Sequence, residues 1–249
     1  MKKIKLNSIP THAVEKIDKD FVKKDLEKLK LKLEELQYLM YAEHKHALLV
    51  VLQGMDASGK DGAIKNVFDA VNPQGCRVIS FKEPTLPEQN HDFLWRIHQH
   101  VPEKGMICVF NRSHYEDVLV ERVHHMVSNK VIKQRFDQIN DFEKLLLETG
   151  THVLKFYLHV SKAEQMKRLK ERLSDPAKSW KYNEGDLKER KLWKSYMRAY
   201  EDVFENCSLH TPWYIIPADH NRYKEYMIAK RIVETLKGLN MKFPKLKVD

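Results

Sequence analysis

A short glycine-containing loop between an apolar run and an amphipathic segment constrains this chain most. Leu48 to Gln53 precede the loop Gly54-Met-Asp-Ala-Ser-Gly-Lys60, and a segment with helical periodicity follows it. Two glycines let the backbone amides turn inward, and the amino end of the next helix adds partial positive charge. Lys60 then reaches toward the terminal phosphates of a bound anion. The pattern predicts a strand, a phosphate-binding loop and a helix in succession, a context that a chance Gly-Lys turn would lack.

Five short apolar runs alternate with amphipathic segments along the chain. This alternation predicts a mostly parallel sheet covered by helices on both faces. Ligands bind at the carboxyl ends of such strands, so the loops after the first three strands should meet at one site. The length of 249 residues fits one domain, residues 1–249. The expected strands are 47–52, 78–81, 106–110, 153–158 and 213–216, and the expected helices are 60–72, 88–100, 114–149, 161–174, 186–206 and 221–238.

A long amphipathic helix is expected at about 20–43. Its apolar residues recur at alternating spacings of three and four, which is an a/d stripe. We expect this stripe to dock on the main domain, and a coiled-coil dimer is the alternative, disfavoured because the stripe is short. The stripe consists of Leu26, Leu29, Leu33, Leu36 and Met40.

Two carboxylates set this glycine loop apart. Asp61 takes the place of the Ser or Thr whose hydroxyl usually holds magnesium, and Asp56 lies within the loop. A carboxylate among phosphate-binding amides would repel phosphate unless a cation lay between them. We therefore infer that Asp56 binds Mg²⁺, a hard cation that prefers oxygen ligands. For Asp61 we favour a helix-capping role, with help to the metal as the alternative.

The end of the third expected strand carries a second group of charged residues, in Asn111-Arg-Ser-His-Tyr-Glu-Asp117. Arg112 should emerge beside the glycine loop, where a guanidinium can neutralise charge on a phosphoryl group in flight. Glu116 and Asp117 follow on the first turn of the next helix, and Asp117 is our candidate for a second metal contact. Simple stabilisation of the helix dipole is the alternative for both carboxylates.

The positive charge of the chain is concentrated in one segment. The formal net charge is +9, which favours anionic partners but does not separate nucleic acid, an acidic membrane and a phosphorylated substrate. Between Lys167 and Arg198 there are eleven Lys or Arg and five Asp or Glu. We expect residues of about 168–190 to form a lid over the phosphates. Its charge exceeds what one nucleotide triphosphate requires and suits a longer polyanion, although part of it will be a solvated helix face.

The cellular location is inferred from what the sequence lacks. No apolar run is long enough to span a bilayer, and the basic segment from Met1 to Lys5 lacks the apolar stretch of a signal peptide. Three widely separated cysteines are expected to be reduced thiols rather than a disulfide or a metal set. We expect a cytoplasmic protein that does not bind membranes.

Several separated motifs, in order from about Asp20 to about Leu239, resemble the type-2 polyphosphate kinase family. The resemblance implies an α/β P-loop fold of the thymidylate-kinase type, a three-layer sandwich with a five-stranded parallel sheet and a helical lid. It also implies homo-oligomers, often dimers or tetramers. The motifs are Gly54-Met-Asp-Ala-Ser-Gly-Lys-Asp-Gly62, Val71-Asn-Pro-Gln-Gly75, Ser80-Phe-Lys-Glu-Pro84, His91-Asp-Phe-Leu-Trp-Arg96, Asn111-Arg-Ser-His-Tyr-Glu-Asp117, Asp175-Pro-Ala-Lys-Ser-Trp-Lys181 and Trp213-Tyr-Ile-Ile-Pro-Ala-Asp219.

The resemblance further implies Mg²⁺-dependent, reversible transfer of a terminal phosphoryl group between inorganic polyphosphate and a nucleotide. Asn111, in place of Asp, together with Glu116 resembles the subgroup that accepts both AMP and ADP, and guanine nucleotides are a further possibility. By the family pattern, Asp56 and Asp117 hold magnesium, and catalysis depends on Asp56, Lys60, Arg112, Asp117 and Arg172. The implied polyphosphate contacts are Ala57, Ser58, Gly59, Lys60, Asp61, Lys65, Arg112, Arg172 and Lys181, and the implied nucleotide contacts are Lys82, Asn111, Glu116 and Asp117.

Two other functions fit part of the sequence. An ATP-dependent nucleoside monophosphate kinase of the same fold would share the glycine loop and Arg112, but it would not need Asp56 or the charge of the lid. A basic P-loop protein that binds nucleic acid would interleave exposed aromatic and basic residues. Trp180, Tyr182, Trp193 and Tyr196 lie in the basic segment and permit that idea. Aromatics at helical spacing are more often core, so nucleic acid is the least favoured partner.

Overall fold

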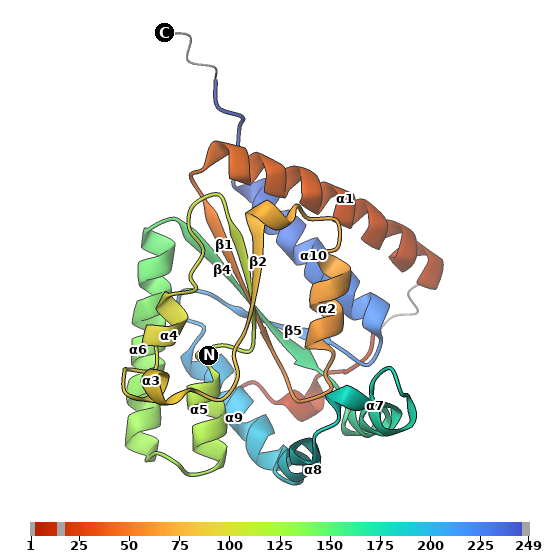
Figure 1. Cartoon of the computed structure of the whole chain (residues 1–249), viewed down its shortest axis with the longest axis vertical. Coiled ribbons are helices and arrows are strands. Elements are labelled where there is room, and N and C mark those ends of the chain that lie inside the picture. The colour runs from red at the N-terminus through yellow and green to blue at the C-terminus, as the bar shows by residue number, and fades with distance from the viewer. Residues whose placement is uncertain (1–2, 14–17, 246–249) are drawn as a thin grey trace.

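Five parallel strands form one sheet at the centre of the molecule (Figure 1). The computed structural model describes residues 3–13 and 18–245. The strand order is β2-β3-β1-β4-β5, so the strand that enters the glycine loop lies in the middle. Every residue of that strand is buried, as expected for a sheet with helices on both faces. The strands are β1 (Ala47–Gln53), β2 (Cys76–Ser80), β3 (Ile107–Asn111), β4 (Thr151–His159) and β5 (Trp213–Pro217).

The helices form two layers, one on each side of the sheet. Figure 1 shows α1, α2 and α10 on one side and α5, α6 and α9 on the other, with α7 and α8 at the carboxyl ends of the strands. The fold is therefore the expected three-layer α/β arrangement. The helices are α1 (Lys19–Glu43), α2 (Lys60–Val67), α3 (Leu86–Gln89), α4 (Trp95–His98), α5 (Glu116–Val123), α6 (Asn129–Glu148), α7 (Lys162–Ser174), α8 (Glu184–Lys191), α9 (Trp193–Asn206) and α10 (Asn221–Gly238).

The predicted strands agree with the structure to within two residues at each end, but several predicted helices are wrong in extent. The single helix expected over 114–149 is two helices. His125 adopts a left-handed backbone with φ of 56°, and Ser128 caps the start of α6 through Val131 N. The helix expected over 88–100 is two single turns, α3 and α4, and the helix expected over 186–206 is divided at Leu192 between α8 and α9.

The long helix α1 confirms the expected docking on the main domain. It packs along α10, and Leu26, Leu33, Leu36 and Met40 are buried. All three cysteines are free thiols, as expected. Among the described residues, no helix combines the length and the apolar character that a membrane span requires.

Candidate active site

The glycine loop lies at the carboxyl end of β1, and its backbone conformation explains why two of its positions are glycine. Gly54 has φ of 150°, and a Cβ there would lie 2.9 Å from the carbonyl oxygen of Leu158. Gly59 has φ of 93° at the N-cap of α2, a conformation that side chains disfavour. Ala57 takes a left-handed φ of 59° without being glycine. Such strain persists only where surrounding contacts enforce it, which is typical of functional loops.

The contacts that enforce this shape come from α7 and α10 and act on the carbonyls of the loop. Gln165 Nε2 donates to Asp56 O at 2.9 Å. Arg168 Nη1 donates to Ala57 O at 3.2 Å and to Ser58 O at 3.0 Å, and Lys224 Nζ donates to Gly59 O at 3.0 Å.

These three side chains, Gln165, Arg168 and Lys224, are called the carbonyl clamp below. Successive carbonyls that are held on one side leave the intervening amides free to face a phosphate on the other. Sequence reasoning missed all three as site residues.

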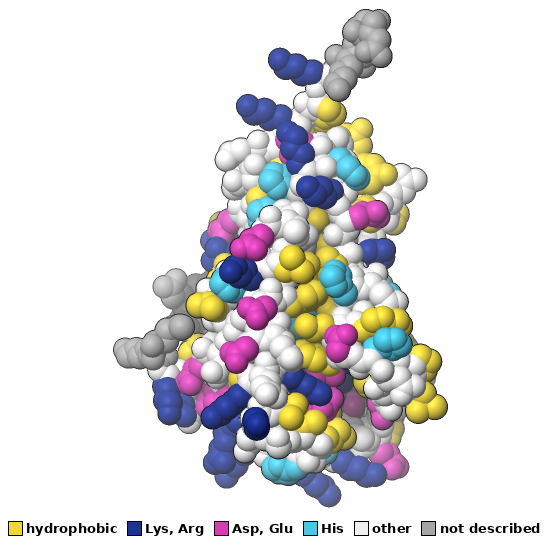
Figure 2. Space-filling model, turned by 90° about the vertical axis from the view of Figure 1, so that its left-hand side faces the viewer, with side chains coloured by type: hydrophobic (Ala, Val, Ile, Leu, Met, Phe, Trp, Pro, Cys, Tyr) yellow, Lys and Arg dark blue, Asp and Glu magenta, His cyan; other side chains and the backbone are white. Residues whose placement is uncertain are grey.

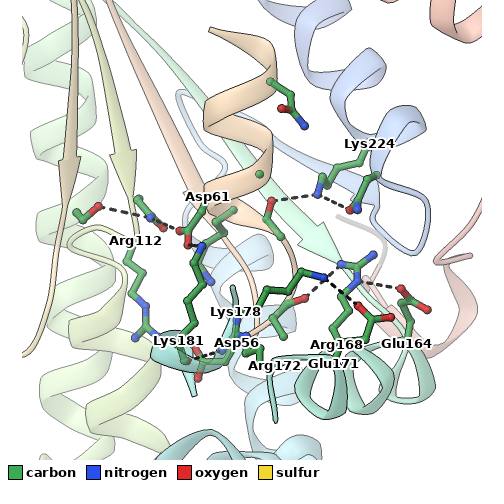
Figure 3. Close-up of a pocket in the computed structure, with 18 of the residues that line it drawn as sticks. Asp56, Asp61, Arg112, Glu164, Arg168, Glu171, Arg172, Lys178, Lys181 and Lys224 are labelled. Carbon is green, nitrogen blue, oxygen red and sulfur yellow. Dashed lines mark hydrogen bonds and ion pairs between the residues drawn. The ribbon is translucent and has the colours of Figure 1, made fainter. Parts of the chain in front are cut away.

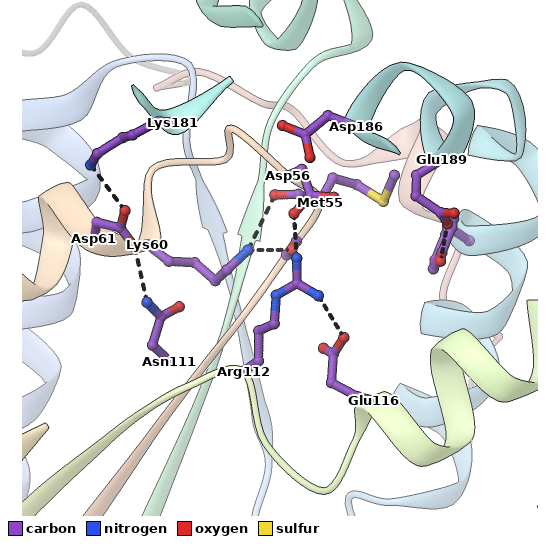
Figure 4. Close-up of polar contacts among 12 residues, drawn as sticks. Met55, Asp56, Lys60, Asp61, Asn111, Arg112, Glu116, Lys181, Asp186 and Glu189 are labelled. Atoms are coloured by element: carbon purple, nitrogen blue, oxygen red, sulfur yellow. Dashed lines mark hydrogen bonds and ion pairs between the residues drawn. The ribbon is translucent and has the colours of Figure 1, made fainter. Parts of the chain in front are cut away.

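Lys60 closes the loop from within. Its ammonium donates to Gly54 O at 2.7 Å and to Met55 O at 3.3 Å (Figure 4). The residue is 8% exposed, and burial, reinforced by the charge of Arg112, lowers its pKa below the ordinary value. An ammonium that is short of counter-charge in a buried position is prepared to bind an anion.

Arg112 joins the end of β3 to the glycine loop, as predicted. Its guanidinium contacts Asp56 Oδ1 at 2.5 Å and Glu116 Oε2 at 3.0 Å (Figure 4). The charge of Glu116 is the largest influence that raises its pKa, so the guanidinium stays charged. Its backbone is left-handed, with φ of 63°, which again places strain at the site. Arg112, Asp56 and Glu116 therefore form one charged unit beside the loop.

Asp61 does not cap α2, so the favoured capping role is wrong. The N-cap of α2 is Gly59, and no side chain caps it. The carboxylate of Asp61 instead accepts from Asn111 Nδ2 at 2.9 Å and from Lys181 Nζ at 3.1 Å. Partial burial alone would raise the pKa of Asp61, but these two bonds outweigh it and hold the pKa below its usual value. Asp61 thus links the end of β3 to the lid.

The lid begins in the last turn of α7 and continues through a 3-10 turn, Ser179–Lys181, into α8. Arg172 Nη1 donates to Asp186 Oδ2 at 2.7 Å and to Lys181 O at 3.3 Å. Burial is the main cause that raises the pKa of Asp186, and the charge of Asp56 adds to it. Arg172 thus joins two parts of the lid expected over 168–190, and Lys181 ties the lid to Asp61 in the first turn of α2.

A cavity of about 990 Å³ lies between the glycine loop and the lid (Figure 3). Nine Lys or Arg and five Asp or Glu line it. On the face shown in Figure 2, Lys and Arg side chains also gather at the lower end, where Figure 1 places α7 and α8. The structure brings to this cavity the predicted residues Asp56, Ala57, Gly59, Lys60, Asp61, Lys82, Asn111, Arg112, Arg172 and Lys181. Glu116 lines a smaller cavity of about 220 Å³ that shares Asp56 and Arg112 with the larger one.

Three predicted residues do not line either cavity. Asp117 is 5% exposed and faces Arg96 Nη2 at 3.6 Å. Burial there raises its pKa to about 7, so its position does not support the predicted metal and nucleotide contacts. Lys65 is exposed on α2, and Ser58 is fully buried with no hydrogen-bond partner for its hydroxyl among the described residues.

The carboxylate of Asp56 suits the magnesium inferred from the sequence. One oxygen contacts Arg112, and the other accepts no hydrogen bond from the residues that the structure describes. Mg²⁺ commonly binds through one or two carboxylates and completes its shell with water and substrate phosphates. No group of three or more His, Cys, Asp or Glu positioned to hold a metal exists in the described ranges. Asp56 therefore fits a cation that arrives with a phosphate ligand better than one held by the protein alone.

Aromatic residues in the basic segment divide between core and surface. Tyr196 and Tyr200 are buried, at 6% and 3% exposed, whereas Trp180 on the lid is 77% exposed. Trp193 packs against the core. The interleaved row of exposed aromatics that nucleic-acid binding would use is therefore absent from the described part of this segment.

A central parallel sheet, a glycine loop before α2 and a cationic lid over that loop define a P-loop phosphotransferase of the kinase type. Residues 16–244 match the family model described as polyphosphate kinase 2. The chain belongs to the polyphosphate kinase 2 family.

Known relatives agree with this assignment. The chain is 52% identical over 217 residues to an AMP/ADP-polyphosphate phosphotransferase of Meiothermus ruber, covering 87% of this chain and 81% of the relative. It is 43% identical over 226 residues to an ADP-polyphosphate phosphotransferase of Rhodopseudomonas palustris, covering 86% and 78%. The crystal structure of polyphosphate kinase 2 from Arthrobacter aurescens superposes with a TM-score of 0.96 at 40% identity, covering 100% of this chain and 90% of that one.

Proposed function

We propose that this protein transfers the terminal phosphoryl group of inorganic polyphosphate to AMP and ADP, reversibly and with Mg²⁺. The observation that carries the proposal is the lining of the large cavity, with nine cationic side chains around one glycine loop. Against the five acids of the same lining these cations leave a net positive charge, which attracts a polyanion such as polyphosphate. The similarity to a relative named for both AMP and ADP supports the choice of acceptors.

The position of each residue in the site indicates its role in the proposed reaction. Lys60 and the amides of the glycine loop bind the reacting end of polyphosphate, and Arg112 stabilises charge on the phosphoryl group during in-line transfer. Lys82 after β2, Asn111 at the end of β3 and Glu116 on α5 are placed to hold the nucleotide. The acceptor phosphate is already ionised, so no general base is required.

Magnesium, when bound with the phosphates, would neutralise charge on the oxygens of the transferred group. Asp56 would hold it from the rim of the loop. The lid, which carries Arg172 and Lys181, would cover the bound polyphosphate and exclude water from the transfer.

Several finer properties are part of the proposal. Guanine nucleotides are candidate acceptors, since a relative in Corynebacterium glutamicum is described as a putative GDP-polyphosphate phosphotransferase. We further expect one catalytic domain that assembles as a dimer or tetramer and acts in the cytoplasm.

The experiment compares the purified wild type with Lys60→Ala and Asp56→Ala. We expect each variant to lose at least about 100-fold in kcat, as for other losses of transition-state charge stabilisation, while its melting temperature stays near that of the wild type. Lys65→Ala, on the exposed face of α2, is the matched control. Near-wild-type kcat in either active-site variant would refute the assigned role.

A further inference from the structure

A third cavity, of about 520 Å³, adjoins the cavity of about 990 Å³, which is called the phosphate cavity below, on the side away from β2 and β3. It lies between the start of α1, the first half of α7 and the start of α10, and it shares Glu164, Lys167 and Asn221 with the phosphate cavity. His12 and four further basic residues line it, and these four, Lys19, Lys167, His220 and Arg222, are called the distal groove below. The glycine loop therefore connects to a further cationic surface beyond the lid.

The acids of this cavity are already engaged, and part of its positive charge is not. Glu164 accepts from Arg168 Nε at 2.9 Å, and Lys167 lies 3.6 Å from it. Asp219 accepts from Ser161 N and from Thr11 Oγ1, each at 2.7 Å.

Across residues 3–13 and 18–245, no ion pair joins Lys19 or Arg222 to an acid. Both residues are exposed. Their charge is available to an anion that enters the groove.

The strand order places this groove opposite the acceptor. Strands β2 and β3 lie on one side of β1 and β4 and β5 on the other, so Lys82 and Asn111 flank the glycine loop on the first side. The groove follows β4 and β5 on the second side. In-line transfer puts the acceptor and the remainder of the donor on opposite sides of the moving phosphoryl group, and the groove is on the side that the remainder of the donor must take.

We propose that the distal groove binds the phosphate units of a long polyphosphate chain behind its reacting end. This inference rests on the proposed function. Arg168 and Lys224, which hold the carbonyls of the glycine loop, lie along the path between loop and groove and keep it positive. The groove makes affinity depend on chain length, because a donor too short to reach Lys19 and Arg222 forgoes their attraction.

The test measures KM for a series of polyphosphates, from tripolyphosphate to long chains, with ADP as acceptor. The variant is the double charge reversal Lys19→Glu with Arg222→Glu. The matched control is Lys170→Glu with Lys230→Glu, which makes the same charge change at exposed positions of α7 and α10 outside both cavities. A milder Lys19→Gln with Arg222→Gln variant covers the case in which the reversal impairs folding.

We expect KM for long chains to rise roughly tenfold in the groove variant, because each reversal replaces an attraction by a repulsion. The rise for tripolyphosphate should be less than about threefold, since it leaves most of the groove empty. Equal length dependence in the groove variant and the control would overturn the proposal.

Equilibrium binding of long polyphosphate without nucleotide provides a readout that needs no turnover. The groove variant should bind with a smaller slope of log affinity against log salt than the control, by about 1 to 2, as expected when one or two cations no longer release counterions. Identical slopes would contradict the groove, and so would displacement of long polyphosphate by single-stranded RNA at equal phosphate concentration. If wild type binds polyphosphate but transfers phosphate from no chain length, the proposed function fails and the groove stands.

Discussion

The two walls of the phosphate cavity hold their charge in different ways. The wall from α7 and α10 carries the carbonyl clamp, where Lys224 is 0% exposed and the Arg168 side chain is 12% exposed. The lid wall carries Lys181 and Lys178, whose side chains are 34% and 51% exposed. Buried cations bonded to backbone carbonyls fix a structure, whereas exposed cations in surface ion pairs contribute little to stability and can attract a ligand. We therefore expect the clamp to shape the loop and the lid to supply affinity for the ligand.

The largest expected effect comes from Arg168→Met in the clamp. Arg168 also donates through Nη2 to Ala218 O at 2.8 Å and Asp219 O at 3.0 Å, so its loss leaves four carbonyls and Glu164 without their donor. We expect the free energy of unfolding to fall by about 2–4 kcal/mol and kcat/KM to fall roughly 100-fold. Urea unfolding and initial rates check this. The matched control is Arg135→Met on α6, because Arg135 is also partly buried and donates to Asp117 O and Glu121 away from the glycine loop. Equal losses of stability and of kcat/KM in both variants would show that Arg168 has no role beyond that of any partly buried arginine.

A pH dependence should come from Lys224. Burial, aided by the charges of Arg168 and Lys60, lowers its pKa to about 8. A lowered pKa means that the ammonium is lost from the free enzyme as the pH rises through about 8, and kcat/KM for polyphosphate should fall there. The Lys224→Gln variant should show a lower plateau and lose this limb of the profile. An unchanged alkaline limb in that variant would assign it to another group, such as Lys60.

The linked effect on stability has the opposite sign. The unfolded lysine binds its proton up to a pH near 10.5, the folded one only to about 8, so the unfolded state holds more protons in this window. The free energy of unfolding should therefore rise with pH between these values in the wild type, and rise less in Lys224→Gln. Melting temperatures measured across this window test the sign.

The smallest stability effect is expected in the lid. Lys181→Ala breaks one half-exposed pair with Asp61, so unfolding should change by less than about 1 kcal/mol. KM for polyphosphate should nevertheless rise roughly threefold to tenfold, because a cation is removed from the ligand path. Lys178→Ala, whose pairs with Glu171 and Asp175 keep it on the lid surface, should raise KM by only about twofold. A large loss of stability in Lys181→Ala would show that the lid, like the clamp, is needed to stabilise the fold.

The sequence predicted only part of the fold and of the two walls formed by the clamp and the lid. The strands and α1 were predictable because hydrophobic periodicity dominates them, and Lys60, Arg112 and Asp56 followed from one motif and one strand end. The division of 114–149 into α5 and α6 was not, because the left-handed turn at His125 has no strong sequence signal.

The clamp was hidden because its acceptors are backbone carbonyls more than a hundred residues away in sequence. One available signal was overlooked. Lys224 lies one and two turns before Ile228 and Ile232, both 0% exposed, so it is a lysine on the buried face of a helix. Such a residue needs a partner, which can be a functional loop.

The most direct test of the proposed function starts from AMP, Mg²⁺ and long-chain polyphosphate, with no ATP present. Nucleotides are separated over time, and a parallel reaction of ADP without polyphosphate measures dismutation. The proposed function predicts that ADP appears first, that ATP follows, and that the parallel reaction forms far less ATP. Formation of ADP only after ATP is added as donor would contradict polyphosphate transfer and favour an ATP-dependent nucleoside monophosphate kinase.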